Sequence, residues 1–215
     1  MNSNKFPNLK IIDHPLVQHK LAHMRDFRCN KDQFRAYARE ISLLMTYEIS
    51  RDLPCVTRDI QTPVDMATCQ VLRDDMPVIV PILRAGLGMA EGLEQLLPGA
   101  PIGHIGLYRD EESKKPVEYL VKLPDLKDRK TFIVDPMLAT GHTSVKAIDI
   151  LIENGAKLEN LSLMVLVAAP EGVNEVSRHY PDMGIITASL DDKLNDQAFI
   201  VPGLGDAGDR LFGTK

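Results

Sequence analysis

The chain has 215 residues, of which 44% are apolar and 26% are charged. These values are ordinary for a globular protein, and the length predicts one α/β domain, residues 1–215, rather than two full domains. The net charge is −5 and aromatic residues make up only 5% of the chain. This balance argues against nucleic acid or an anionic membrane surface as a partner.

The three cysteines, Cys29, Cys55 and Cys69, show neither zinc-site spacing nor the even count of a disulfide framework. A reducing cytoplasm is therefore the expected location. The N-terminus lacks the apolar core of a signal peptide, and no segment reaches the roughly 18 apolar residues of a membrane helix. We expect a protein that is neither exported nor inserted in a membrane.

The first 60 residues are predicted to be mainly helical. After an extended entry at residues 9–12, Asp13 is the expected cap of a helix that Pro15 begins and that ends near residue 28. A second helix is expected over residues 31–53, because its apolar residues recur with a period of 3.6 and mark one buried face.

From Met76 onward the pattern changes to short apolar strands separated by helices. The run "MPVIVPI" is typical of a strand covered on both faces, and Gly155 stands where a helix C-terminal glycine is expected. Strands that alternate with helices predict a mainly parallel sheet flanked by helices. A further strand is expected at 103–108, and another, in "VEYLVKLP", follows the charged stretch "RDEESKKP". Three more strands are expected at 131–134, 161–167 and 185–188, with helices at 143–154 and 173–179 between them.

The stretch "VDPMLATGHTS", residues 134–144, connects a strand to a helix through small and hydroxyl residues. Free N–H groups and the helix dipole make such a helix start suited to a phosphate, with Gly141 closing the backbone around it. The hydroxyls of Thr140, Thr143 and Ser144 are candidate donors. Asp135 follows the strand at the edge where open α/β sheets bind ligands. A plain turn with a helix cap is the competing interpretation.

These residues resemble the phosphoribosyl diphosphate (PRPP) motif of the type I phosphoribosyltransferases. The Asp-Pro-Met-Leu-Ala-Thr-Gly version is similar to the uracil phosphoribosyltransferase branch, with Pro136 where relatives carry a second acid. The segments "DHPLVQHKLAHMRD", "PILRAGLGMAEGL", "GHIGLYRDEE", "VAAPEGV" and "FIVPGLGDAGDRLFGT" extend the resemblance over nearly the whole chain. It departs from the family at His142, where glycine is usual, and around Cys29 and Asn30.

The resemblance implies a type I phosphoribosyltransferase fold: a mainly parallel central sheet flanked by helices, a flexible hairpin arm, and a small hood of C-terminal and N-terminal segments. It implies pyrimidine salvage, the reaction of uracil with PRPP to give UMP and diphosphate. Asp135 and Arg109 are the implied catalytic residues, and the segment from Asp110 to Pro116 is the implied flap over diphosphate. The implied PRPP-binding residues are Arg84, Arg109, Asp135, Pro136, Met137, Leu138, Ala139, Thr140, Gly141, His142, Thr143 and Asp206.

For the base, the resemblance implies main-chain recognition of uracil by Ile200, Gly205, Asp206 and Ala207. A glycine-rich backbone offers N–H and C=O groups without side chains in the way. Mg²⁺ is the implied cofactor, bound through PRPP and water rather than by protein ligands. The family also implies a homodimer or higher homo-oligomer and GTP as a candidate activator.

Several alternatives stay open at this point. Arg84 could belong to a structural ion pair and Arg109 to the solvated surface, and the C-terminal glycines could form a mobile tail. Transfer to another base, an RNA-binding regulator with the same fold, and a weakened enzyme are rivals in function. We expect His142 to be tolerated, because its side chain can point to solvent while the backbone binds phosphate.

Overall fold

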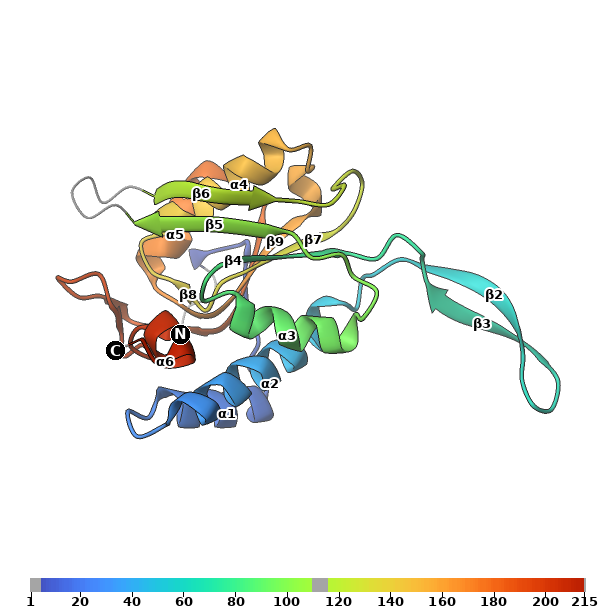
Figure 1. Ribbon diagram of the computed structural model, residues 1–215, viewed down its shortest axis with the longest axis horizontal. Coiled ribbons are helices and arrows are strands. Elements are labelled where there is room, and N and C mark those ends of the chain that lie inside the picture. The colour runs from blue at the N-terminus through green and yellow to red at the C-terminus, as the bar shows by residue number, and fades with distance from the viewer. Residues whose placement is uncertain (1–4, 110–115, 215) are drawn as a thin grey trace.

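A computed structural model of the protein describes residues 5–109 and 116–214 (Figure 1). Its centre is an eight-stranded sheet in the order β1-β10-β9-β7-β4-β5-β6, with β8 paired to β9 beyond β7. All neighbouring strands are parallel except β6, which is antiparallel to β5. The strands are β1 (Leu9–Ile11), β4 (Val78–Leu83), β5 (His104–Arg109), β6 (Pro116–Lys122), β7 (Thr131–Val134), β8 (Met137–Leu138), β9 (Leu161–Ala168) and β10 (Gly184–Leu190).

Helices cover both faces of the sheet, as predicted (Figure 1). One face packs against α1 (Pro15–Arg25), α2 (Lys31–Ile49), α3 (Leu87–Leu96) and α6 (Ala207–Phe212), and the other against α4 (His142–Glu153) and α5 (Pro170–His179). A short 3-10 turn, η2 (Leu158–Asn160), leads into β9.

Alternate residues of each central strand enter opposite cores. In β7, Phe132 and Val134 join the core under α1 to α3, whereas Ile133 joins the core under α4 and α5. β9 divides in the same way, with Met164 on one side and Leu163 on the other. Because successive side chains of a strand point to opposite faces, a strand buried on both sides must be apolar throughout. The continuous apolar runs of the sequence follow from this.

The N-terminal helices are shorter than predicted. The cap of α1 is His14, whose Nδ1 accepts a hydrogen bond from the Leu16 N–H at 3.2 Å, so the prediction of Asp13 is wrong by one residue. Pro15 does begin the helix, where its missing N–H costs nothing. α2 starts with a capping box between Asn30 and Gln33 and ends before the predicted boundary.

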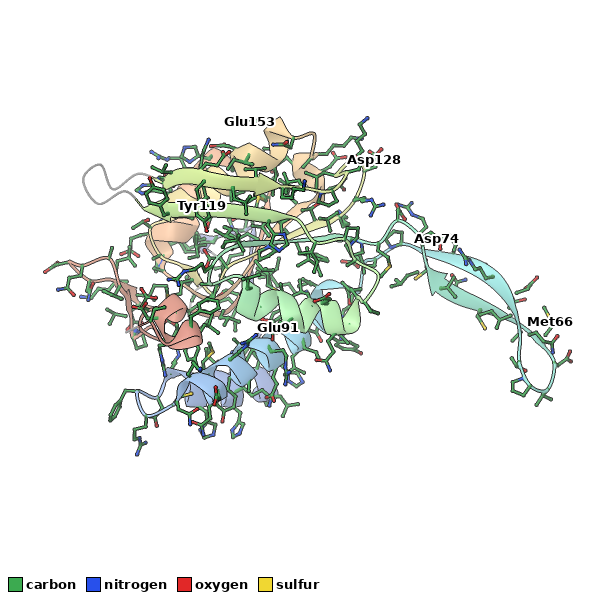
Figure 2. All side chains as sticks on the ribbon, in the orientation of Figure 1. Met66, Asp74, Glu91, Tyr119, Asp128 and Glu153 are labelled. Atoms are coloured by element: carbon green, nitrogen blue, oxygen red, sulfur yellow. The ribbon has the colours of Figure 1, made fainter. Side chains whose placement is uncertain are left out.

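Residues 55–72 form an antiparallel hairpin that the helical prediction missed. β2 (Cys55–Gln61) and β3 (Met66–Leu72) pair along their whole length and project away from the sheet and its helices. Figure 2 shows Met66 at the far end of this hairpin and Asp74 at its base. Most of its residues are exposed on both faces. The hairpin therefore lacks the buried apolar face by which strands are usually recognised in a sequence.

The C-terminal residues are ordered rather than a mobile tail. β11 (Lys193–Leu194) and β12 (Ile200–Val201) form a small hairpin, and α6 follows it, with Leu211 buried against the N-terminal layer. Figure 1 shows α6 beside the sheet on the side of α1 to α3. Among the described residues, no helix is both long enough and apolar enough to cross a membrane.

Candidate active site

The candidate site lies where the parallel strands end. β4, β5, β7 and β10 point the same way, so the residues that follow them gather at one edge of the sheet. Gly86 shows how close two of these segments are, because a Cβ there would lie 2.4 Å from the carbonyl oxygen of Val134. The turn after β4 and the loop after β7 are therefore in contact.

Residues 135–143, the Asp135 loop, are anchored to β9. The Asp135 N–H donates to the Met164 carbonyl at 3.2 Å, and the Pro136 carbonyl accepts from Leu166 and Val167 at 3.1 Å each. β8 then continues the parallel pairing along β9. Pro136 uses only its carbonyl here, so its lack of an N–H costs no hydrogen bond. The proline that stands in place of a second acid thus fixes the start of the loop.

The carboxyl group of Asp135 has an unusual environment. Burial at the end of β7 raises the pKa of Asp135 to about 7, although the nearby Met137 N–H favours the ionised form. The group is therefore balanced between its acid and its carboxylate near neutral pH. Perturbed carboxyl groups of this kind are concentrated at functional sites.

Glycine is required at Gly141 for two reasons. Its φ of +86° lies in the left-handed region, and a Cβ would meet the Gly172 carbonyl oxygen at 2.9 Å and the Glu175 Cβ at 2.8 Å. Gly172 in turn lies against the Ala139 carbonyl, where a Cβ would approach to 2.4 Å. The Asp135 loop is thus packed backbone to backbone on the first turn of α5.

Gly141 is also the cap of α4, and it has no side chain to accept from the first-turn N–H groups. Those groups and the helix dipole make this end of α4 a suitable anion site. Thr140 and Thr143 are half-buried beside it. Ser144 is only 2% exposed, and the role of its hydroxyl as a phosphate donor stays a prediction.

His142 begins α4 with a side chain that is 53% exposed, as expected for a group that points to solvent. Its Nε2 lies 4.0 Å from Glu175 Oε1 on α5. The imidazole therefore faces the first turns of α5. Its backbone can serve the loop as a glycine would.

Arg84 follows β4 and is exposed, with its guanidinium 5.5 Å from the centre of the Phe212 ring of α6. Among the described residues no carboxylate pairs with it, so the structural ion-pair interpretation is not supported. Arg109 is the last residue of β5, and its backbone pairs with Pro116 at the same edge. The predicted flap lies mostly in residues 110–115, outside the described residues.

Residues 200–207, the glycine segment, carry the residues predicted to bind the base. Ile200 is buried in β12, and Gly205 has a φ of +76°. Asp206 is exposed and caps α6, since one carboxylate oxygen accepts from the Asp209 N–H at 3.0 Å. Ala207, the first residue of α6, is fully buried.

Three residues that contact the glycine segment were missed from the sequence: Arg25 at the end of α1, Asp191 after β10, and Arg210 in α6. The sequence could have indicated Asp191, because this acidic residue directly follows a buried strand, as Asp135 does. Arg25 and Arg210 had no such signal, because Asp191 and Gly203, which Arg25 binds, and Asp26, which Arg210 binds, lie 166 to 184 residues away in the sequence.

In the described part of the chain, no three side chains of His, Cys, Asp or Glu gather in a way that could hold a metal ion. Asp135 and Asp206 belong to no such cluster there, since Asp135 is partly buried at the end of β7 and Asp206 is exposed at the start of α6. Isolated carboxylates fit an ion that keeps most of its water and is held by substrate phosphates, which is the usual behaviour of Mg²⁺.

The sequence profile described as uracil phosphoribosyltransferase matches residues 11–214. The chain belongs to the uracil phosphoribosyltransferase family. Similar family members include a uracil phosphoribosyltransferase of Paraburkholderia phymatum, 55% identical over 99% of this chain and 98% of the relative. Another, of Rhodospirillum centenum, is 57% identical over 98% of this chain and 97% of the relative.

Solved structures give the same answer for the fold of this uracil phosphoribosyltransferase family member. The AQ2163 protein from Aquifex aeolicus superposes with a TM-score of 0.91 at 32% identity, covering 96% of this chain and 99% of that one. APRTase from Giardia lamblia, at 16% identity, has a TM-score of 0.51 over 73% of this chain and 80% of that one. The predicted type I phosphoribosyltransferase fold is confirmed.

Proposed function

We propose that the chain transfers the phosphoribosyl group of PRPP to a ring nitrogen of uracil, giving UMP and diphosphate in pyrimidine salvage. The bond between the anomeric carbon and the diphosphate oxygen breaks, a carbon–nitrogen bond forms, and the nitrogen loses its proton. The observation that carries this proposal is the Asp135 loop, where a carboxyl group adjoins a helix start suited to a phosphate.

The 5-phosphate of PRPP would lie against the Asp135 loop. Its oxygens would accept hydrogen bonds from backbone N–H groups of residues 139–143 and from the hydroxyls of Thr140 and Thr143. This assignment is supported by the left-handed backbone at Gly141 and by the tight packing of the loop on α5. A loop held on both sides needs little rearrangement when the phosphate arrives.

Asp135 would face the ribose. Vicinal hydroxyl groups can donate to a carboxylate, and positive charge that develops on the ring in the transition state would favour the ionised form. The raised pKa of Asp135 supports this role, because a buried carboxylate gains most from partners that replace its lost water.

Diphosphate would be held by Arg84, which follows β4, and by Arg109, the last residue of the adjacent parallel strand β5. Arginine suits this task because its planar group stays charged and binds phosphate oxygens in pairs. Arg109 would thereby assist departure of the leaving group. The stacking of Arg84 on Phe212 supports a guanidinium held in place without a competing carboxylate.

Uracil would be recognised by main-chain atoms of Ile200, Gly205, Asp206 and Ala207. A rigid backbone that donates to one carbonyl of uracil would meet the amino group of cytosine donor to donor, leaving buried groups unpaired. Asp206 is also assigned to PRPP, through water or an ion. Mg²⁺ would enter on the phosphates of PRPP and lower the charge repulsion of the leaving group.

We also propose a homodimer or higher homo-oligomer that acts in the cytoplasm, with GTP as a candidate activator. The projecting β2–β3 hairpin supports self-association, because Ile60, Val64 and Met66 are exposed on it. Exposed apolar residues that gather near one end of a hairpin can serve as a contact surface for a second copy of the chain. Size-exclusion chromatography with light scattering tests the first point, and UMP formation with and without GTP tests the second.

The proposed reaction is tested by a panel of bases. The protein is incubated with PRPP, Mg²⁺ and each of uracil, cytosine, orotate and guanine, and nucleotide products are separated by chromatography. We expect UMP from uracil and no product from the other three. Product only with orotate or guanine would contradict the proposal.

A further inference from the structure

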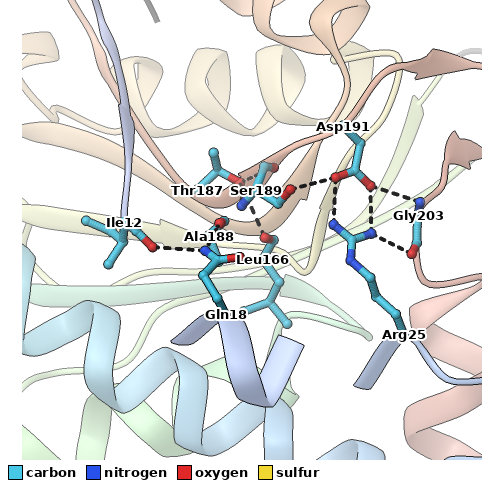
Figure 3. A network of polar contacts seen from close by, with 9 residues as sticks. All are labelled: Ile12, Gln18, Arg25, Leu166, Thr187, Ala188, Ser189, Asp191 and Gly203. Atoms are coloured by element: carbon cyan, nitrogen blue, oxygen red, sulfur yellow. Dashed lines mark hydrogen bonds and ion pairs between the residues drawn. The ribbon is translucent and has the colours of Figure 1, made fainter. Parts of the chain in front are cut away.

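A partly buried ion pair between Arg25 and Asp191 lies beside Gly203 of the glycine segment (Figure 3). The Arg25 guanidinium donates to both carboxylate oxygens of Asp191, at 2.7 and 2.6 Å. The Asp191 side chain is 2% exposed and that of Arg25 is 21% exposed. Two parallel hydrogen bonds in this geometry fix both the distance and the plane of the pair.

Both partners also bind the backbone of Gly203, one at each of the two peptide groups that flank its Cα. The Arg25 guanidinium donates to the Gly203 carbonyl at 2.6 Å, and the Gly203 N–H donates to Asp191 at 2.9 Å. Gly203 sits in a left-handed turn with a φ of +63°, where a Cβ would lie 2.1 Å from the Ile200 carbonyl oxygen. The ion pair therefore holds the turn that joins Ile200 to residues 205–207.

The network is closed around Asp191. The Ser189 hydroxyl donates to Asp191 at 2.7 Å, and the Asp191 N–H donates to the Ala168 carbonyl at 2.8 Å. Burial alone would raise the pKa of Asp191, but hydrogen bonds from Arg25 and Ser189 outweigh it and hold the pKa below its usual value. The group is thus a carboxylate at neutral pH, and Arg25 is a lasting partner.

A second arginine fixes the next carbonyl. Arg210 donates to the Leu204 carbonyl at 2.8 Å and to the Asp26 carbonyl at 2.7 Å, and its guanidinium lies 4.3 Å from the Phe34 ring centre. The Gly203 carbonyl is thus bound by Arg25 of α1, and the Leu204 carbonyl by Arg210 of α6, which also contacts the N-terminal residues Asp26 and Phe34. The neighbouring residues Ile200, Gly205 and Ala207 are those assigned to the base.

We propose that Arg25 and Asp191 are positioning residues for the nucleobase: by binding the N–H and the carbonyl of Gly203, they hold the main-chain groups of residues 200–207 in the spacing that uracil requires. Neither side chain touches the substrate. The proposal rests on the proposed function, because it assumes that uracil binds to this segment. It goes beyond that function because it makes the affinity for uracil depend on two side chains that do not themselves bind uracil.

The experiment measures UMP formation by Arg25→Lys and Asp191→Asn, with uracil varied at saturating PRPP and then the reverse. We expect KM for uracil to rise about 10-fold or more, while KM for PRPP stays within about 2-fold. Loss of a purely structural contact would instead lower the amount of active protein and leave both KM values unchanged. The double variant Arg25→Gln/Asp191→Asn should be no worse than Asp191→Asn, because the pair acts as a unit.

Arg73 and Asp75 provide a matched control. They form another bidentate arginine–aspartate pair, but they precede β4 and so lie at the opposite edge of the sheet. Arg73→Lys and Asp75→Asn should leave both KM values within about 2-fold. An equal rise of KM for uracil in the control pair would show that the effect is not specific to the glycine segment, and would overturn the proposal.

Thermal melting shows whether each variant is folded at the assay temperature. Should Asp191→Asn be unfolded, Arg25→Lys and Ser189→Ala take its place, since each removes only part of the network. An unchanged KM for uracil in both would overturn the proposal. Failure of the proposed function gives a different result, because wild-type protein would then form no UMP from uracil.

Discussion

The Asp135 loop and the glycine segment are both irregular stretches at the same edge of the sheet, yet they are held in opposite ways. The loop is fixed by the strand it leaves, the helix it begins and close backbone packing on α5. The glycine segment is fixed by side chains, and Arg25 stands 178 residues away from the carbonyl that it binds. The proposed PRPP site is thus fixed mainly by backbone contacts of its own loop, and the proposed uracil site by side chains from distant parts of the chain.

This difference predicts how the two regions respond to substitution. Changes in the Asp135 loop should act on PRPP and on the chemical step, and they should need no distant partner to explain them. Substitutions that disturb the glycine segment should raise KM for uracil, even where the substituted residue is distant in the sequence. Four substitutions in and around the loop test the first half of this comparison, and the Arg25 and Asp191 variants test the second.

Asp135→Asn should have the largest effect, lowering kcat by about 10²- to 10³-fold because it removes the negative charge next to the ribose. The same substitution should raise the free energy of unfolding at neutral pH. The folded state raises the pKa of Asp135 to about 7, so the protonated group favours folding below an ordinary pKa of 3.8, and this advantage is lost as pH rises through about 7.

The asparagine cannot ionise, so above pH 7 the variant should exceed wild type in free energy of unfolding by on the order of 2–4 kcal/mol. The gap should close as pH falls toward 4. Urea denaturation at pH 5, 6, 7 and 8 measures it. A gap that does not change with pH would mean that Asp135 is not the buried, titrating group described above.

Gly141→Ala should lower activity by about 10²-fold and the free energy of unfolding by about 1–3 kcal/mol, because it adds both backbone strain and a clash with α5. Gly155→Ala is its matched control. Gly155 has a similar φ of +92°, but a Cβ there meets nothing within 4 Å. The control should cost about 1–2 kcal/mol of stability and leave activity unchanged. Equal losses of activity in both variants would refute a local packing role.

Arg84→Lys should raise KM for PRPP about 10-fold and leave KM for uracil within about 2-fold, since lysine keeps the charge but loses paired binding to phosphate and stacking on Phe212. Steady-state kinetics of UMP formation measure both constants. This variant is the mirror image of Arg25→Lys, an arginine change of the same size. Should both raise the same KM, the two regions would not be separate substrate sites.

His142→Gly should have the smallest effect, less than about 3-fold on any kinetic constant. The side chain is mostly exposed and the loop is proposed to bind phosphate through its backbone. A large gain in activity would show that histidine weakens the site, and a large loss would show that the imidazole takes part. Assays at several PRPP concentrations separate the two outcomes.

The central sheet was predicted closely because its signals are local. Residues 131–134 are apolar on both faces, and the predicted strand coincides with β7 (Thr131–Val134). The β2–β3 hairpin was missed because neither of its faces is buried, so it shows no apolar periodicity. The pairing of its two strands is therefore seen only in the structure.

The candidate site shows the same division. The sequence of the Asp135 loop predicted the strand end, the glycine turn and the helix start that the structure shows, because the residues that form them stand together in one short stretch. The role of Pro136 and the surroundings of His142 became clear only from contacts with β9 and α5. The pair of Arg25 and Asp191 was decided entirely by tertiary structure, because ion pairs between distant residues leave no periodic trace in a sequence. Local backbone conformation depends on neighbouring residues and can be predicted from them, whereas the partners of a buried charge come together only when the chain folds.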